Sequence, residues 1–311
     1  MSVMRKVLLA MSTSPFLREQ ATKRTFVRKS VSAFMPGEKI EDALQAAAAL
    51  KPQGINTILT RLGEGVTKLD EAERVTEHYL DVLDKVKAAG LDAQISVKPT
   101  QLGLDLDAAQ CQRNLDRICD KAERLGNVPV WIDMENSPYV DPTLELFRKS
   151  KERYKGVGIA IQAYLYRTAK DVESLIALGP AIRIVKGAYL EPAEVAYPKK
   201  SDVDENFYTL CCRLLKDDAQ RSGTLLHIAT HDTALAERLS KYIDDNKVPS
   251  SAYEFAMLYG IQRSQQLRLA REGRRIRVLI SYGEYWFPWY MRRLAERPAN
   301  VTFVLKNLVG G

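Results

Sequence analysis

The chain has 311 residues, 46% of them apolar and 27% charged, a composition typical of a globular protein. No apolar run approaches the ~20 residues of a membrane span, and the four cysteines and three histidines lack the spacing of a metal site. The net charge of +7 is spread over predicted helix faces instead of being gathered among aromatics, which argues against a nucleic-acid-binding protein.

The cysteines are typical of buried, reduced thiols. Cys111 and Cys119 lie in one predicted helix, and Cys211 and Cys212 are adjacent, positions that favour small apolar core groups over redox centres. We therefore expect a cytoplasmic protein with no bound metal. The surplus positive charge is either a solvated basic surface or an attraction to an anionic membrane or substrate. Contact with the membrane would then be peripheral, at the inner face of the cell membrane.

The N-terminal stretch from Met1 to Met35 allows two interpretations. Its arginines, lysines and serines with only one acid, Glu19, are typical of a transit peptide. Its apolar positions also fit amphipathic helices, and we favour this second interpretation. These positions are Phe16, Phe26, Val27, Val31 and Phe34.

After residue 52, short apolar runs alternate with helical segments. We predict eight strands, at residues 54–61, 92–98, 129–133, 156–164, 181–186, 225–230, 250–255 and 276–281. The helices between them carry start and stop signals, such as an early acid or a following glycine. We predict helices over 69–89 before Gly90, over 107–125 before Gly126, from an N-cap at Asp141 with Pro142 to Gly156, from a capping box at Thr168 and Asp171 to Gly179, from near Ser201, Asp232 and Gly260, and over 284–297.

Eight strands that alternate with helices predict an α/β fold, a parallel (β/α)8 barrel of the TIM type. No G-x-G-x-x-G follows the first strands, which disfavours a dinucleotide-binding Rossmann domain. We expect one domain over residues 1–311, with extra N-terminal helices in 1–52 and the barrel in 53–311.

Barrel enzymes place their active sites at the carboxyl ends of the strands. The polar residues predicted there are Glu64, Lys98, Asp133, Gln162, Tyr164, Lys186, Tyr189, His231, Asp232, Glu254, Tyr282 and Glu284. Lys98 and Asp133 end adjacent strands and can neutralise one another, although Lys98 also fits a solvated turn. For Asp232 we favour a helix cap, and for His231 a hydrogen-bonding residue over a catalytic base.

The segment from 282 to 300 reads YGEYWFPWYMRRLAERPAN. Adjacent side chains on a helix point about 100° apart, so Arg292 and Arg293 reach one ligand only if the last helix lies across the barrel mouth. Paired arginines fit a carboxylate through planar, bidentate hydrogen bonds.

Several blocks, in order along most of the chain, resemble the proline dehydrogenase family in its short, single-function form. They read KRTFVRKSVSAFMPGE, RLGEGV, ISVKPTQLG, VWIDMEN, IQAYLYRTAKD, RIVKGAYLEP, ATHD, YEFAMLYG and YMRRLAERPAN. The resemblance implies a distorted barrel whose last helix lies above the strands. It also implies that FAD oxidises L-proline to Δ1-pyrroline-5-carboxylate, that a membrane quinone takes the electrons, and that a pyrroline-5-carboxylate dehydrogenase uses the product.

The resemblance also assigns roles around the substrate. Lys98, Arg292 and Arg293 would bind the substrate carboxylate. Asp133 would hold Lys98 and itself lie near the substrate, and Tyr189 would line the proline ring.

A second set of roles concerns the flavin and the closing of the site. The positions similar to flavin contacts are Met134, Gln162, Arg183, Lys186, Gly187, Ala188, Thr230 and His231. The resemblance makes Lys98, Asp133 and Arg183 the catalytic set, and Glu64 a gate that pairs with Arg292. One departure stands in the last strand, where many relatives carry a tyrosine against the substrate ring and Leu279 occupies its place here.

Two other functions remain open. A Schiff-base lyase would use Lys98 or Lys186 as its nucleophile, although the loop from 257 to 260 has one glycine where phosphate-binding barrels have several. A basic scaffold would bind nucleic acid through its arginine-rich helices.

Overall fold

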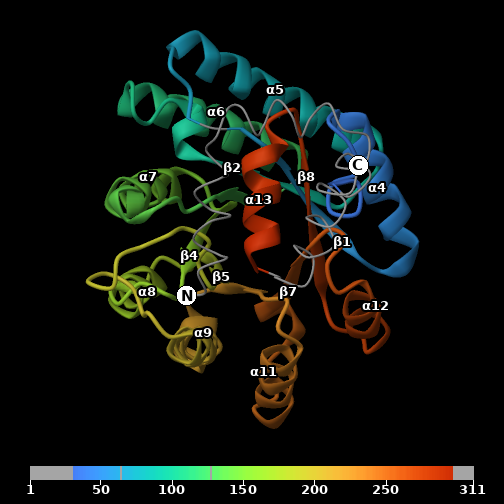
Figure 1. The fold of residues 1–311 in the computed structure, drawn as a ribbon, viewed down its shortest axis with the longest axis vertical. Coiled ribbons are helices and arrows are strands. Elements are labelled where there is room, and N and C mark those ends of the chain that lie inside the picture. The colour runs from blue at the N-terminus through green and yellow to red at the C-terminus, as the bar shows by residue number, and fades with distance from the viewer. Residues whose placement is uncertain (1–30, 64, 127, 297–311) are drawn as a thin grey trace, which may run out of the picture.

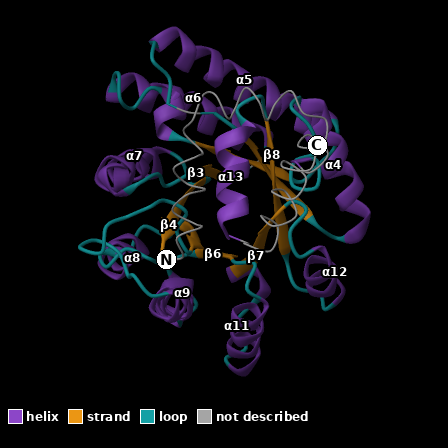
Figure 2. Cartoon of the chain, in the orientation of Figure 1, coloured by secondary structure: helices purple, strands orange, loops and turns teal. Residues whose placement is uncertain are grey.

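The computed structural model describes residues 31–63, 65–126 and 128–296, with side chains described through Met291. Eight parallel strands form a closed barrel in chain order, and helices surround it (Figures 1 and 2). The strands are β1 (Asn56–Arg61), β2 (Ala93–Val97), β3 (Val130–Ile132), β4 (Val157–Gln162), β5 (Ala181–Val185), β6 (Leu225–Ala229), β7 (Tyr253–Leu258) and β8 (Ile276–Tyr282). β1 closes the ring on β8, where Thr60 lies beside Ser281. The predicted (β/α)8 barrel is confirmed.

The strands separate two apolar regions because successive side chains point to opposite faces. Ile58, Trp131 and Ala181 form a cluster of their own, with Leu225 and Leu279 packed against it. Each of these five comes from a different strand, namely β1, β3, β5, β6 and β8, and together they form an apolar layer inside the barrel. The larger core lies between the outer face of the strands and the helices.

Helices surround the barrel on its outer side, except the last one, α13, which lies across the barrel mouth (Figure 1). They are α4 (Ile40–Leu50), α5 (Leu69–Ala88), α6 (Ala108–Leu125), α7 (Val140–Arg153), α8 (Thr168–Ile176), α9 (Lys200–Leu214), α10 (Asp217–Arg221), α11 (Thr233–Asp245), α12 (Arg263–Arg271) and α13 (Trp286–Glu296), with 3-10 turns at Lys51–Gln53, Pro99–Leu102, Ser137–Tyr139 and Ser250–Ala252. Asp107 and Asp232 cap α6 and α11 through their side chains, as predicted for Asp232. Gly126 ends α6 at φ +79°, a conformation that favours glycine.

Two helices outside the regular βα pattern bear on the site. α4 precedes the barrel, whereas residues 1–30 and the apolar positions named in them lie outside the described residues. α13 crosses in front of the barrel mouth in Figure 1, as expected for the last helix. Its Trp286 Nε1 donates a hydrogen bond to Glu38 Oε1 at 3.0 Å, which ties α13 to the segment before α4.

Two predicted N-caps are wrong because tertiary partners use the side chains. α7 begins at Val140, and Asp141 instead forms an ion pair with Arg167. α8 begins at Thr168, whose hydroxyl donates to Gln162 O at 2.6 Å, so no capping box forms.

Other boundaries shift by a few residues. The seventh strand begins at Tyr253 and not at residue 250, because a 3-10 turn occupies 250–252. α7 ends at Arg153, before Gly156. α12 begins at Arg263, three residues after Gly260. A Cβ on Gly260 would lie 1.7 Å from Ala33 O, so the turn before α12 packs closely on the N-terminal segment.

Three of the four thiols, those of Cys111, Cys119 and Cys211, are buried in the outer core, and Cys212 is half-buried. Burial raises the pKa of the Cys111 thiol to about 12, which makes it a poor nucleophile. In the part of the chain that the structure describes, none of the helices is long and apolar enough to span a membrane.

Candidate active site

A cavity of about 1320 Å³ opens at the carboxyl ends of the strands, on the side where α13 lies. All eight strands or the residues just after them contribute to its wall, and Trp289 of α13 lines it from the other side. Open ends of parallel barrels are where the βα loops bring polar side chains together. The predicted position of the active site therefore coincides with a large cavity.

Asp133 lies at the centre of a charged cluster in this cavity. Its Oδ1 lies 2.5 Å from Arg183 Nη2 and accepts a hydrogen bond from Ser96 Oγ at 2.6 Å. Its Oδ2 lies 3.6 Å from Lys98 Nζ. The predicted Lys98–Asp133 pair is confirmed, and the barrel adds Arg183 as a second cation.

Arg183 is almost completely buried, at 3% exposure. Burial lowers the pKa of its guanidinium, and the neighbouring Asp133 opposes that effect. Nη2 donates to Ser96 Oγ as well as to Asp133, whereas Nη1 has no hydrogen-bond partner among the described residues. A buried guanidinium N–H without a partner is costly, so Nη1 is suited to a ligand in the cavity.

Gln162 presents a second such atom. Its Nε2 donates to Met134 O at 3.5 Å, and within the described part of the chain its Oε1 lacks a partner. Gln162 and Met134 both line the cavity. An acceptor from β4 and a donor from β5 are thus available to one bound group, because these strands are neighbours.

The chain after β5 forms another part of the wall. Gly187 has φ +115°, and a Cβ there would lie 2.5 Å from the Tyr164 ring. Only glycine allows the backbone to lie on that ring. Ala188 and Tyr189, which follow, also line the cavity.

Lys186 lies at the rim of the cavity and is held by carboxylates. Its Nζ forms ion pairs with Asp204 at 2.5 Å and Asp232 at 3.1 Å. Lys200 contacts the same two carboxylates, so the four side chains join the end of β5 to the starts of α9 and α11. Asp232 therefore serves both as a helix cap and as a rim residue.

At the end of β6, Thr230 and His231 line the cavity. His231 Nε2 accepts a hydrogen bond from the backbone N–H of Leu258 at 2.9 Å. Gln262 Nε2 donates to His231 O at 3.3 Å. This confirms His231 as a hydrogen-bonding residue that ties β6 to β7.

Some sequence candidates are not brought into this cavity. Tyr282 points out of the barrel, where its hydroxyl is hydrogen-bonded to His78 Nε2 at 2.8 Å. Leu279 points inward and lines the cavity, as its assignment to the place of the relatives' tyrosine requires. Glu254 is buried in the barrel interior beside Arg277 and is not among the cavity-lining residues.

The side chains of three candidates fall outside the part of the chain that the structure describes. Glu64 and the side chains of Arg292 and Arg293 lie outside the described residues, although α13 carries both arginines across the mouth of the barrel. Ser96 is the residue that the sequence analysis missed. Its position two residues before Lys98 on a strand, and hence on the same face, is the signal that points to it.

Comparisons with known proteins agree with the geometry. The family model described as proline dehydrogenase matches residues 43–306. Proline dehydrogenase 2 of Bacillus subtilis subsp. natto is 35% identical over 99% of each chain. Proline dehydrogenase of Deinococcus radiodurans is 36% identical over 99% of this chain and 98% of that one.

Solved structures support the fold. Proline utilization A (PutA) from Bdellovibrio bacteriovorus, inactivated by N-propargylglycine, superposes with a TM-score of 0.80 at 24% identity. The match covers 94% of this chain and 36% of that longer chain.

Proposed function

This chain belongs to the proline dehydrogenase family, and on that premise we propose that it oxidises L-proline to Δ1-pyrroline-5-carboxylate with FAD as cofactor, the first step of proline catabolism. The observation that supports the proposal best is the cluster of Lys98, Asp133 and Arg183 in the wall of the large cavity. The cluster offers Lys98 as a cation for the carboxylate of the substrate, and Arg183 Nη1 as a buried hydrogen-bond donor for the cofactor.

The cavity fits a flavin by the chemistry of its lining. Arg183 Nη1 is a charged donor and Gln162 Oε1 an acceptor, and both lack partners among the described residues. The other proposed contacts, which also line the cavity, are Met134, Lys186, Gly187, Ala188, Thr230 and His231. When bound, FAD would supply the two-electron acceptor for the hydride that leaves the carbon next to the proline nitrogen. The charge on Arg183 would stabilise negative charge that develops beside it.

Substrate binding is assigned to the cations at the mouth of the cavity. Lys98, held by Asp133, follows β2, and Arg292 and Arg293 belong to α13, whose Trp289 lines the cavity. We propose that these three cations bind the carboxylate of proline, and that Glu64 closes the site by pairing with Arg292. Tyr189 would contact the proline ring.

The same cations bear on the protonation of the substrate. Positive charges around the carboxylate disfavour a second positive charge on the nearby amine. We infer that the productive form of proline has a neutral nitrogen. The task of this chain is then to hold and orient that form, because positioning accounts for much of the rate when a cofactor carries the redox chemistry.

The family resemblance also suggests what happens to the electrons and to the product. We propose that a membrane quinone reoxidises the flavin during peripheral contact with the membrane. A pyrroline-5-carboxylate dehydrogenase would consume the product. This partner is suggested by the bifunctional PutA proteins. The match to the Escherichia coli PutA covers 23% of that longer protein.

The structure disfavours the Schiff-base lyase. A Schiff-base lysine must be neutral and unpaired when it attacks a carbonyl group. Lys98 is paired with Asp133, and Lys186 with Asp204 and Asp232. Trapping with borohydride and a carbonyl substrate would label such a lysine, and we expect no label.

The first experiment is a visible absorption spectrum of the purified protein, before and after anaerobic addition of L-proline. We expect flavin bands that bleach with L-proline and persist with D-proline, the matched control. A protein that stays colourless after incubation with FAD would refute the proposed cofactor. Bands that persist with both enantiomers would refute the proposed substrate.

A further inference from the structure

A stack of side chains lies inside the barrel next to Arg183. The guanidinium carbon of Arg183 lies 4.9 Å from the centre of the Trp131 ring. The Trp131 ring in turn packs against the His227 ring, with 4.3 Å between ring centres. Trp131 and His227 are both fully buried. The only cation–π contact of Arg183 in the described part of the chain is thus made to a ring inside the barrel.

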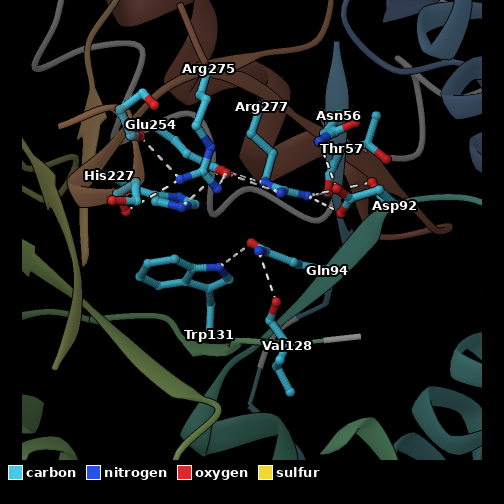
Figure 3. Close-up of polar contacts among 12 residues, drawn as sticks. Asn56, Thr57, Asp92, Gln94, Val128, Trp131, His227, Glu254, Arg275 and Arg277 are labelled. Carbon is cyan, nitrogen blue, oxygen red and sulfur yellow. Dashed lines mark hydrogen bonds and ion pairs between the residues drawn. The ribbon is translucent and has the colours of Figure 1, made fainter. Parts of the chain in front are cut away.

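The indole ring of Trp131 is fixed by a hydrogen bond to Gln94 and fits into the room left by a glycine on the neighbouring strand. Its Nε1 donates to Gln94 Oε1 at 2.8 Å, and Gln94 Nε2 donates to Val128 O at 3.1 Å (Figure 3). On β4, a Cβ at Gly158 would lie 2.8 Å from the indole, so glycine makes room for the ring. A buried side chain fixed in this way has one orientation.

The far side of the stack carries balanced charge. His227 Nε2 lies 3.1 Å from Glu254 Oε2, and Arg277 Nε donates to the same carboxylate at 2.6 Å (Figure 3). Arg277 Nη1 also lies 2.9 Å from Asp92 Oδ1, and Arg275 forms an ion pair with Glu254, so two arginines face two carboxylates. Burial lowers the pKa of His227 to about 4, so its ring is neutral near pH 7. The His227 ring, which contacts both Glu254 and Trp131, therefore adds no positive charge to the stack beside Arg183.

An aromatic ring supports a buried cation differently from a hydrogen-bond acceptor. The π face attracts the guanidinium without using any of its N–H groups. A carboxylate or carbonyl in the same place would engage further N–H groups of Arg183. Asp133 and Ser96 already engage Nη2, and within the described residues Nη1 is left unpaired.

We propose that Trp131 is a positioning residue: its ring supports the Arg183 guanidinium so that Nη1 remains available to the group bound in the cavity, and Gln94 fixes the ring. The inference rests on the proposed function, since the bound group is taken to be the flavin. Trp131 acts through Arg183, which would stabilise the reduced cofactor, and it does not contact the substrate itself.

The test is the reduction potential of the bound flavin, measured by equilibrium titration against a reference dye. In Trp131→Leu, we expect the equilibrium constant for two-electron reduction to fall about tenfold, which equals a potential about 30 mV lower. Trp131→Phe keeps a ring face and should stay within about threefold of the wild type. Gln94→Leu frees the indole and should give an intermediate shift of the same sign. Tyr282→Phe, a buried change outside the barrel, is the control and should leave the potential unchanged.

Each outcome bears on the proposal. A folded Trp131→Leu protein with the wild-type potential would overturn it, as would equal shifts in the leucine and phenylalanine variants. If Trp131→Leu does not fold, a wild-type potential in Gln94→Leu overturns it. A wild-type protein that takes up no flavin refutes the proposed function, whereas a flavin that L-proline reduces in the wild type but whose potential ignores Trp131 refutes only this inference.

Discussion

Neutralising Asp133 should destabilise the protein because its carboxylate is the counter-charge of a buried cation. Asp133 is one-fifth exposed, and it contacts both Arg183 and Lys98. In Asp133→Asn, the Arg183 guanidinium keeps its charge and its burial but loses its carboxylate partner. The cost arises from that uncompensated charge and not from the lost contact as such.

The magnitude follows from the burial of the pair. Removing one partner of a buried ion pair costs about 3–5 kcal/mol, and the partial exposure of Asp133 places the expected loss near the lower end, at about 3 kcal/mol. The unfolding entropy of 311 residues is about 0.65 kcal/mol/K, which converts this loss into a Tm lower by about 5 °C.

Thermal unfolding at pH 7, followed by circular dichroism, measures this difference. Asp141→Asn is the matched control, because Asp141 is an exposed partner of Arg167 and its loss should cost under about 1 kcal/mol. A double variant, Asp133→Asn with Arg183→Met, removes the buried charge together with its partner. We expect the double variant to lose at least about 1.5 kcal/mol less stability than the sum of the losses in the two single variants. Additive effects would refute the argument from uncompensated charge.

Three further outcomes are expected. Arg183→Ala should lower flavin content without unfolding the barrel, and full flavin content with normal turnover would contradict its role. Arg292→Lys should raise the KM for L-proline strongly in steady-state kinetics, because a point charge replaces a planar fork; an unchanged KM would exclude the role. Burial holds the pKa of His227 near 4, below the ~6.5 of an unfolded histidine, so its contribution to stability is present above pH 6.5 and is lost as the pH falls toward 4. Between pH 6.5 and pH 4, the free energy of unfolding should therefore fall by up to about 3 kcal/mol less in His227→Gln than in the wild type. Denaturant titrations at several pH values measure this difference, and parallel pH profiles of the two proteins would contradict it.

Side-chain alternation explains why the inward face of the barrel was only partly predictable. Once Lys98 is known to point inward, Ser96 and Gln94 must do so as well. Leu279 also points inward, and Tyr282, three residues later on the same strand, must therefore point outward. A single strand does not show which of its faces is the interior. That choice becomes visible only when neighbouring strands pair and the ring closes.

The predicted helix starts were wrong where another group engaged the side chain of the expected N-cap residue. Asp141 and Thr168 have the residue types of N-caps, yet Arg167 and the carbonyl of Gln162 engage them instead. At Asp107 and Asp232 the side chain does cap its helix. The local pattern is the same in both cases, so only the tertiary contacts distinguish them.

The sequence by itself determined the barrel, the order of its elements and the Lys98–Asp133 pair, because strand periodicity and the ends of adjacent strands are local properties of the chain. The tertiary structure decided that Arg183 joins that pair and that Trp131 lies beside it. Those contacts depend on how far each strand is shifted against the next around a closed ring, and side chains from β2, β3 and β5 meet inside the barrel only after that register is set.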